Sequence, residues 1–502
     1  MKLTEYQQKM NRIKLGGFVE HKNMAFSMGA TMILCLIFML ASYDFIEGKV
    51  NTIMLTVACL YLIMSLYMYA VLQKIKKDIV TKGTISNGTR RLGWPMTLFV
   101  LTGNFFGTIG GMYLLSKKKC IEYQLAVYMV ANLLMVMLVS TINIFKPAIP
   151  YYFDLGMGLL AVVLVFYIFV AVMLSKHADE HNIDPRLKKL LIPLALSVVT
   201  GNLFALILVI TMYKRLYQKN KEISIEWIDI MRRLFRNYMS VIGMFIVIFL
   251  VSISICSYLT FDYAVSVENN YSALFQPPSL AYPFGTDNFG RCIFSRIVFG
   301  ARISLSVGMA AIVIPLLVGG TLGSIAGYYG KAVDNVIMRA LDTLYAIPSI
   351  LLAIAIIASF GASTISLIMA ISIAGIPVYA RLVRATVLGI ANSEYVEAAK
   401  ACGATNRIII FKHIVPNSLA PLIVRSTLEI GTAVLSTSTL SYLGIGIPAH
   451  IPEWGNVLRA GSTYLEEHPY MAIFPGLAII LIVLAFNFFG DGLRDALDPK
   501  MK

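Results

Sequence analysis

The stretch of residues 391–416 holds the side chains of this sequence whose types and spacing best suit a chemical task. Ala398 and Ala399 follow Glu397 directly, so a helix here would present a surface with little side-chain bulk. Another protein's backbone can approach such a surface closely, while the Glu397 carboxylate offers it a charge partner. The pattern therefore predicts a docking site for a partner protein, which a structureless connector would not need.

The residues around this surface predict its secondary structure. Ser393 can cap a short helix that carries acidic residues in its early turns, and Gly403 can end that helix. Thr405 can cap a second helix, which must stop before Pro416 because proline does not continue a helix. We therefore expect a helix, a tight turn and another helix.

The sequence contains no nucleotide-binding loop of the form G-x-x-x-x-G-K-[ST]. Its nearest Gly-Lys pairs, at 48–49 and 330–331, are followed by valine and alanine. Nucleotide must therefore be bound by a separate subunit, and we expect no catalytic residue and no bound cofactor on this chain. The six cysteines show no CxxC spacing, so we infer neither a metal site nor a disulfide framework.

The composition indicates that the bilayer is the solvent of this chain. Of its 502 residues, 58% are hydrophobic and 14% are charged, and the mean hydropathy is +0.75. Because lipid offers backbone groups no partner, long apolar runs must be helical. The predicted fold class is all-α, an integral membrane helical bundle. The net charge of +15 comes from short basic segments between apolar runs, which is a sign of membrane topology and not of a nucleic-acid partner.

The N-terminal part, residues 1–221, is predicted to be a separate membrane module of 4–6 segments. Its apolar segments lie near 25–46, 51–73, 92–115, 122–144, 151–175 and 190–213. The residues from Thr102, Thr-Gly-Asn-Phe-Phe, are echoed from Thr200 by Thr-Gly-Asn-Leu-Phe, so the module looks like a duplicated three-segment unit, about 25–115 and 122–213. If both Thr-Gly-Asn segments re-enter, the lysines at 117–119 fall inside; if all six segments span, those lysines lie outside. Asn104 and Asn202 are expected to hydrogen-bond between helices rather than to bind a ligand.

Residues 222–502 are predicted to form a second domain with six transmembrane helices. After an amphipathic segment at 214–237, its apolar runs lie near 238–259, 302–328, 338–360, 364–390, 417–446 and 470–490. If the basic residues before the first run are inside, alternation places the 391–416 stretch and the C-terminus in the cytoplasm. The N-terminus is expected to be a cytoplasmic tail and not a signal peptide. We expect no Arg or Lys inside a core span that would indicate an anionic solute.

The 391–416 stretch resembles the EAA loop of ABC importer permeases. The residues that carry this resemblance are Glu397, Ala398, Ala399, Gly403, His413, Val415 and Pro416. The sequence departs from the family's pattern at two of them, with Val415 where leucine is usual and His413 where isoleucine is common. In that family the loop docks into a groove of the ATPase subunit, and the resemblance implies the same role here.

Within that family, residues 222–502 are most similar to the second-type permease of dipeptide, oligopeptide and nickel importers. A motif at the extracytoplasmic mouth of such permeases is matched by Phe284, Gly285, Thr286, Asp287, Gly290 and Arg291, whereas Tyr282 and Cys292 replace the usual histidine and aspartate. Candidates for structural or gating roles that keep the family's spacing are Arg339, Asp342, Pro348 and Asn487. An Arg339–Asp342 ion pair, a proline kink and interhelical hydrogen bonding would also explain these four residues without a role in transport. Trp454 is expected to be an interfacial anchor or to lie under a docked binding protein.

The resemblance implies that this chain is one part of a transport complex in the plasma membrane of a bacterium. The implied partners are a first-type permease subunit, two ATPase subunits that bind ATP and Mg, and an extracytoplasmic solute-binding protein. This chain would form half of the translocation pathway and carry di- or oligopeptides. Two alternatives stay open: an importer of nickel or another small solute in the same family, and a membrane regulator or receptor that uses the permease architecture.

Overall fold

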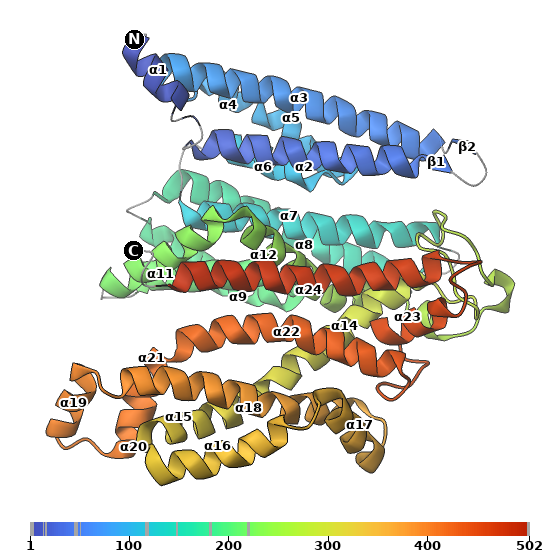
Figure 1. Cartoon of the computed structure of the whole chain (residues 1–502). Coiled ribbons are helices and arrows are strands. Elements are labelled where there is room, and N and C mark those ends of the chain that lie inside the picture. Colours follow the sequence, from blue (N-terminus) through green and yellow to red (C-terminus); the bar gives the residue numbers. More distant parts are fainter. Residues whose placement is uncertain are drawn as a thin grey trace. The chain divides into compact units, whose positions relative to one another are not determined.

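A computed structural model gives the fold of the chain (Figure 1). It describes residues 5–13, 15, 18–44, 49–50, 52–115, 120–146, 149–179, 183–217 and 221–498. The chain divides into two compact units, the first formed by Met1–Val139 and Gly158–Ser224, the second by Ser140–Met157 and Ile225–Lys502. The division differs from the predicted one in that Ser140–Met157 belongs to the second unit. The lysines at 117–119, on which the topology argument depends, lie outside the described residues.

The first unit is built from helices that follow the predicted apolar segments. Its elements are α1 (Glu5–Ile13), α2 (Val19–Ala41), β1 (Tyr43–Asp44), β2 (Lys49–Val50), α3 (Thr52–Lys82), α4 (Asn87–Arg91), α5 (Gly93–Thr97), α6 (Phe105–Leu115), α7 (Ile121–Thr141), α8 (Phe153–His177), α9 (Leu191–Ser197) and α10 (Leu203–Tyr217), with the ends of α7 and α8 in the second unit. Among the described residues of this unit, α2, α3, α7 and α8 carry stretches long and apolar enough to cross a membrane. The unit thus has four continuous candidate spans, the lower limit of the prediction.

The two Thr-Gly-Asn segments interrupt the helices of this unit in the same way. Gly103 and Gly201 have φ of 76° and 75°, the left-handed region that favours glycine. Asn104 and Asn202 are fully buried. Asn104 Oδ1 accepts a hydrogen bond at 3.2 Å from a threonine of α2, and Asn202 Nδ2 donates one at 2.9 Å to a backbone carbonyl of α7. The interhelical role predicted for both asparagines is confirmed, and the breaks favour re-entrant segments over continuous spanning helices.

The second unit contains the other set of predicted apolar runs. Its helices are α11 (Lys221–Arg236, beginning in the first unit), α12 (Tyr238–Thr260), α13 (Ala264–Val267), α14 (Ile293–Ile314), α15 (Gly320–Tyr329), α16 (Lys331–Tyr345), α17 (Ser349–Phe360), α18 (Thr364–Ile390), α19 (Glu394–Ala401), α20 (Asn406–Ile408), α21 (Val415–Asn417), α22 (Leu419–Tyr442), α23 (Trp454–Ser462) and α24 (Tyr470–Leu497). Five continuous stretches among them can cross a membrane: α12, α14 with α15, α18, α22 and α24. The all-α fold class is confirmed: in the part of the chain described, the strands are the two-residue β1 and β2 alone.

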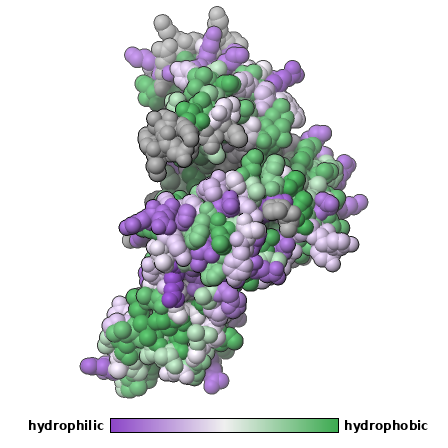
Figure 2. Space-filling model, turned by 90° about the vertical axis from the view of Figure 1, so that its right-hand side faces the viewer, coloured by the Kyte–Doolittle hydropathy of each residue, from purple (hydrophilic) through white to green (hydrophobic). Residues whose placement is uncertain are grey.

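The third predicted span of this unit is bent rather than continuous. Helices α16 and α17 meet at an angle of 83°, and Pro348 stands at the N-cap of α17. Proline has no backbone N–H to donate to the preceding turn, so the predicted kink is found at this residue. Large apolar side chains of α17 are exposed, including Ile350, Leu351 and Phe360, and a hydrophobic surface covers this end of the unit at the bottom of Figure 2. Lipid or another chain would have to cover such a surface.

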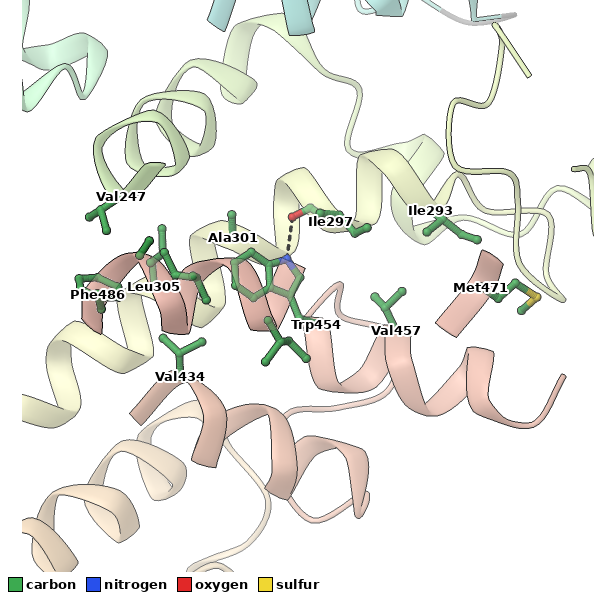
Figure 3. Packing of buried hydrophobic residues seen from close by; sticks show 13 residues of the cluster. Val247, Ile293, Ile297, Ala301, Leu305, Val434, Trp454, Val457, Met471 and Phe486 are labelled. Atoms are coloured by element: carbon green, nitrogen blue, oxygen red, sulfur yellow. Dashed lines mark hydrogen bonds between the residues drawn. The ribbon is translucent and has the colours of Figure 1, made fainter. Parts of the chain in front are cut away.

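A buried tryptophan lies in the hydrophobic core of the second unit, near one end of the unit's helices. Helices α19 to α21 gather at one end of the unit, and α23 lies at the opposite end (Figure 1). Trp454, the first residue of α23, is fully buried, and its Nε1 donates a hydrogen bond at 2.9 Å to the carbonyl of Ile297 (Figure 3). Five helices contribute to this cluster, α12, α14, α22, α23 and α24. The indole is part of the core, so the interfacial-anchor role predicted for Trp454 is wrong, and the alternative role under a docked binding protein stays a prediction.

Candidate functional site

The 391–416 segment folds as a short helix, a tight turn and a second helical stretch. Ser393 and Thr405 occupy the predicted N-caps, but neither side chain makes a capping hydrogen bond. The Ser393 carbonyl instead accepts hydrogen bonds from the backbone of the first turn. Gly403 has φ of 79° with no atom near the position of a Cβ, so the backbone conformation rather than crowding favours glycine there. The turn lets the chain reverse between α19 and α20.

The prediction that the second helix stops before Pro416 is wrong. A π-helical turn, Ile409–Ile414, follows α20, and α21 then begins at Val415 with Pro416 in its first turn. The first turn of a helix tolerates proline, since its N–H groups have no intrahelical partner. In the π-helical turn each hydrogen bond spans five residues instead of four, so the backbone hydrogen-bond spacing changes just before Pro416. The second helical stretch therefore continues to Asn417 and leads almost directly into α22.

The burial pattern of the segment separates a fixed base from an exposed face. Val396, Ile409 and Ile414 are fully buried and belong to a cluster that includes residues of α18 and α22. Glu397 and Ala398 point the other way and are exposed. Further members of the segment are exposed or half-buried, namely Ala399, Gly403, His413, Val415 and Pro416. The segment can thus offer its acidic, small-residue face to a partner while its apolar side stays anchored.

Two ion pairs join α16 to α18, the helix that leads into this segment. Arg384 Nε and Nη2 donate to the two carboxylate oxygens of Asp334, and Arg381 Nη2 donates to Asp342 Oδ1 at 2.6 Å. Among the described residues Asp342 pairs with Arg381 and not with Arg339, which is exposed. The local Arg339–Asp342 pair suggested by the sequence is therefore wrong. A residue of a neighbouring helix reaches the carboxylate, which spacing along one helix does not reveal.

The predicted mouth motif forms a hydrogen-bonded cluster at the end of the unit opposite the 391–416 segment. Asp287 Oδ2 accepts from Arg291 Nε at 2.8 Å, and Thr286 Oγ1 donates to a carbonyl at 2.5 Å. Phe284 stacks on Phe474 of α24 with ring centroids 4.1 Å apart. The motif's two glycines, Gly285 and Gly290, have left-handed φ of 76° and 73° and close contacts at the position of a Cβ. The motif residues are thus brought together, and their side chains hold one another in place.

A cavity between α14, α16 to α18 and α22 is the candidate for one side of a solute path. Its volume is about 650 Å³, and it is lined mainly by apolar side chains together with Tyr345, Tyr379 and Glu429. Glu429 pairs with Arg425 one turn earlier on α22. The expectation that core spans contain no Arg or Lys is therefore wrong, and both residues were missed although they stand in a predicted span. Asn487 is exposed on α24 and does not line this cavity.

Comparison with known proteins connects the second unit to membrane transport. Residues 319–502 match the family model described as binding-protein-dependent transport system inner membrane component. Residues 226–278 match that of the N-terminal TM domain of oligopeptide transport permease C.

Similar proteins also cover this region. A dipeptide transport system permease protein of Alkalihalophilus pseudofirmus is 47% identical over 276 residues, which are 55% of this chain and 90% of that protein. A glutathione transport system permease protein of Pectobacterium atrosepticum is 40% identical over 284 residues, 57% of this chain and 94% of that protein. Among solved structures, an inward-facing methionine ABC transporter is 19% identical with a TM-score of 0.35, covering 40% of this chain and 97% of the solved one.

Proposed function

The chain belongs to the family of binding-protein-dependent transport system inner membrane components and is a permease subunit of an ABC importer, and we propose that its solute is a di- or oligopeptide. It is a multi-pass bacterial membrane protein and a permease subunit rather than an enzyme, and ATP is proposed to be hydrolysed on separate subunits. The identity of 47% to a dipeptide permease over nearly the whole of that protein supports this solute class over nickel.

The observation that carries the mechanism is the two-sided 391–416 segment. Its exposed face, with Glu397 and Ala398, is the proposed docking site for an ATPase subunit, and its buried side is fixed to α18 and α22 through Val396. Closure of two ATPases around ATP and Mg would push on this face, and the packed helices would carry the displacement to the cavity. This chain itself would bind no nucleotide.

Half of the translocation pathway is proposed to lie along the cavity of α14, α16 to α18 and α22. A partner permease of the first type would cover the exposed apolar side chains of α17 and complete the path. An extracytoplasmic binding protein would deliver the solute at the end that carries the mouth motif. The 391–416 segment and the two chain termini would then face the cytoplasm.

A pulldown tests the docking role. The tagged chain is purified from solubilised membranes as wild type, Glu397→Arg and Gly403→Pro, and retained proteins are identified by mass spectrometry. Proline cannot adopt the positive φ of residue 403, so the second variant should distort the turn. The matched control is Glu467→Arg, the same charge reversal at an exposed residue at the end of the unit opposite the 391–416 segment. We expect both segment variants to lose the ATPase and keep the partner permease, whereas the control keeps both. Absence of any ATPase from the wild-type sample would refute the coupling role and favour a regulator or receptor.

Uptake measurements test the solute. Cells that lack this chain are compared with complemented cells for import of a labelled dipeptide, a labelled tetrapeptide and ⁶³Ni²⁺. We expect peptide uptake to depend on the chain. Dependence of nickel uptake alone would assign the importer to the nickel branch of the family and leave the docking result unaffected.

A further inference from the structure

The short segment between α7 and α8 belongs to the second unit although the sequence places it within the N-terminal module. Ser140–Met157 is part of that unit, whereas the family models begin at residue 226. The curated relatives match over 90% or more of their own length with 276–284 residues of this chain. The segment is therefore additional to the part of the chain that corresponds to such permeases, and it packs on that part.

Polar contacts fix the start of the segment at the end of α12. Asn143 is buried, and its Nδ2 donates a hydrogen bond at 2.8 Å to the carbonyl of Thr260. Ser140 Oγ donates to the hydroxyl of the same threonine at 3.1 Å. Thr260 is the last residue of α12, where carbonyl groups lack intrahelical partners. The segment thus satisfies a helix end that the permease part leaves open.

Lys146 is the most specific contact of the segment. Its side chain is only 7% exposed, and Nζ donates a hydrogen bond at 2.6 Å to Ser295 Oγ in α14. The ammonium also lies over the rings of Phe261 and Phe294, 5.1 and 5.5 Å from their centroids. Burial lowers the pKa of Lys146, and the neighbouring Cys292 and Asp262 oppose that shift. A lysine that only tethered a loop would stay in water, so this burial needs the contacts that α14 provides.

The end of the segment approaches the same helices closely. A Cβ at Gly156 would lie 2.9 Å from the Cβ of Leu259 and 3.0 Å from its carbonyl oxygen, so only glycine lets the two backbones come so near. Between these contacts, residues 149–152 form one wall of a cavity of about 780 Å³, and the other walls include Tyr258 and Arg302. The segment therefore encloses surface of α12 and α14 that would otherwise be open.

We propose that residues 140–146 and 149–152, here called the brace, attach the N-terminal module to the end of α12 and the start of α14, with Lys146 as the main anchor. The permease domain then carries a receptor surface for this segment. The brace gives the N-terminal module a physical link to the permease that does not pass through residues 218–224.

Cleavage of the full chain tests the anchor. A specific protease site is inserted between residues 220 and 221, and the C-terminally tagged protein is purified in mild detergent and cut on the resin. We expect the 1–220 fragment to stay bound in the wild type. In Lys146→Glu the charge-assisted hydrogen bond is lost and a carboxylate faces two aromatic rings, so the fragment should be released about tenfold faster or more. Lys77→Glu, the same change at an exposed lysine of α3, is the matched control and should release it at the wild-type rate.

Two further variants protect the test against misfolding. Lys146→Met keeps the length of the side chain without its charge and should release the fragment at an intermediate rate. Gly156→Val should release it through steric conflict with Leu259. Immediate loss of the fragment from the wild type would overturn the proposal, and so would wild-type retention in Lys146→Glu, Lys146→Met and Gly156→Val alike. Because the readout needs neither solute nor ATPase, it is independent of the proposed transport function.

Discussion

Glu453 connects three helices of the permease domain, and its removal should destabilise the fold measurably. The carboxylate is fully buried just before α23. Its Oε1 accepts from Ser438 Oγ at 2.8 Å and from Ser304 Oγ at 3.1 Å, on α22 and α14. Its Oε2 accepts from two backbone N–H groups at the start of α23, at 2.8 and 3.2 Å. One side chain thus caps a helix and holds two others against it.

The magnitude for Glu453→Ala follows from these bonds. Loss of the cap costs about 1 kcal/mol, and each serine hydroxyl left buried without its acceptor costs about 1 kcal/mol more. A total of about 3 kcal/mol lowers the unfolding temperature by roughly 6–12 °C for a domain of this size. Glu453→Gln keeps two acceptor positions and should lose about 1 kcal/mol.

Unfolding can be followed with a thiol-reactive dye. The dye reaches the buried Cys256 and Cys292 only when the domain opens, while the exposed Cys59 and Cys402 set the baseline. Two results would refute the assignment of these bonds as stabilising. One is a melting temperature of Glu453→Ala within 1 °C of that of wild type, and the other is a melting temperature of Glu453→Gln no higher than that of Glu453→Ala.

Burial raises the pKa of Glu453 above its ordinary value of 4.5, so folding favours the protonated side chain. The resulting contribution to stability is complete below pH 4.5 and is lost as the pH rises through the folded-state pKa. The melting temperature of wild type should therefore fall relative to that of Glu453→Gln over that pH range. Asp334→Arg and Arg384→Asp should each lower the melting temperature by an amount corresponding to about 1 kcal/mol, and the double exchange should recover part of it, because the pair is only partly exposed. Trp454→Phe keeps most of the ring but loses the hydrogen bond to Ile297, so it should cost about 1–2 kcal/mol in the same dye assay, well below the effect of Trp454→Ala.

The parts of the structure that the sequence predicted well depend on local signals. The apolar runs give the candidate spans, the helices begin after Ser393 and Thr405 as predicted although neither side chain makes a capping hydrogen bond, and Gly403 marks the turn between them. Pro348 gives the bend between α16 and α17 for the same reason, because one residue determines the backbone hydrogen bonding there. Each of these features is decided within a few residues of chain.

The parts that were missed depend on contacts between segments far apart in the sequence. Asp342 has Arg339 one turn away, yet its partner is on α18. Trp454 looks like an interfacial residue because it stands between two predicted spans, but α14 provides a buried carbonyl for its indole. Lys146 follows an apolar run, and nothing in its neighbours along the chain indicates the serine and two aromatic rings that it contacts. Tertiary packing determines the contact partners of these side chains, and they cannot be predicted from neighbouring residues in a single sequence.

The same packing would let the 391–416 segment act on the proposed solute path, which it does not touch. Val396 of this segment belongs to a continuous buried cluster with Val387 of α18, and the cluster also contains Tyr379 and Ala433. Tyr379 and Ala433 line the cavity of about 650 Å³. Protein interiors are packed nearly as densely as organic crystals, so a displacement of α19 cannot be absorbed by empty space and must shift α18 and α22 with it. The proposed coupling would therefore run through this contiguous apolar cluster, and the ion pairs between α16 and α18 would add stiffness without being part of that route.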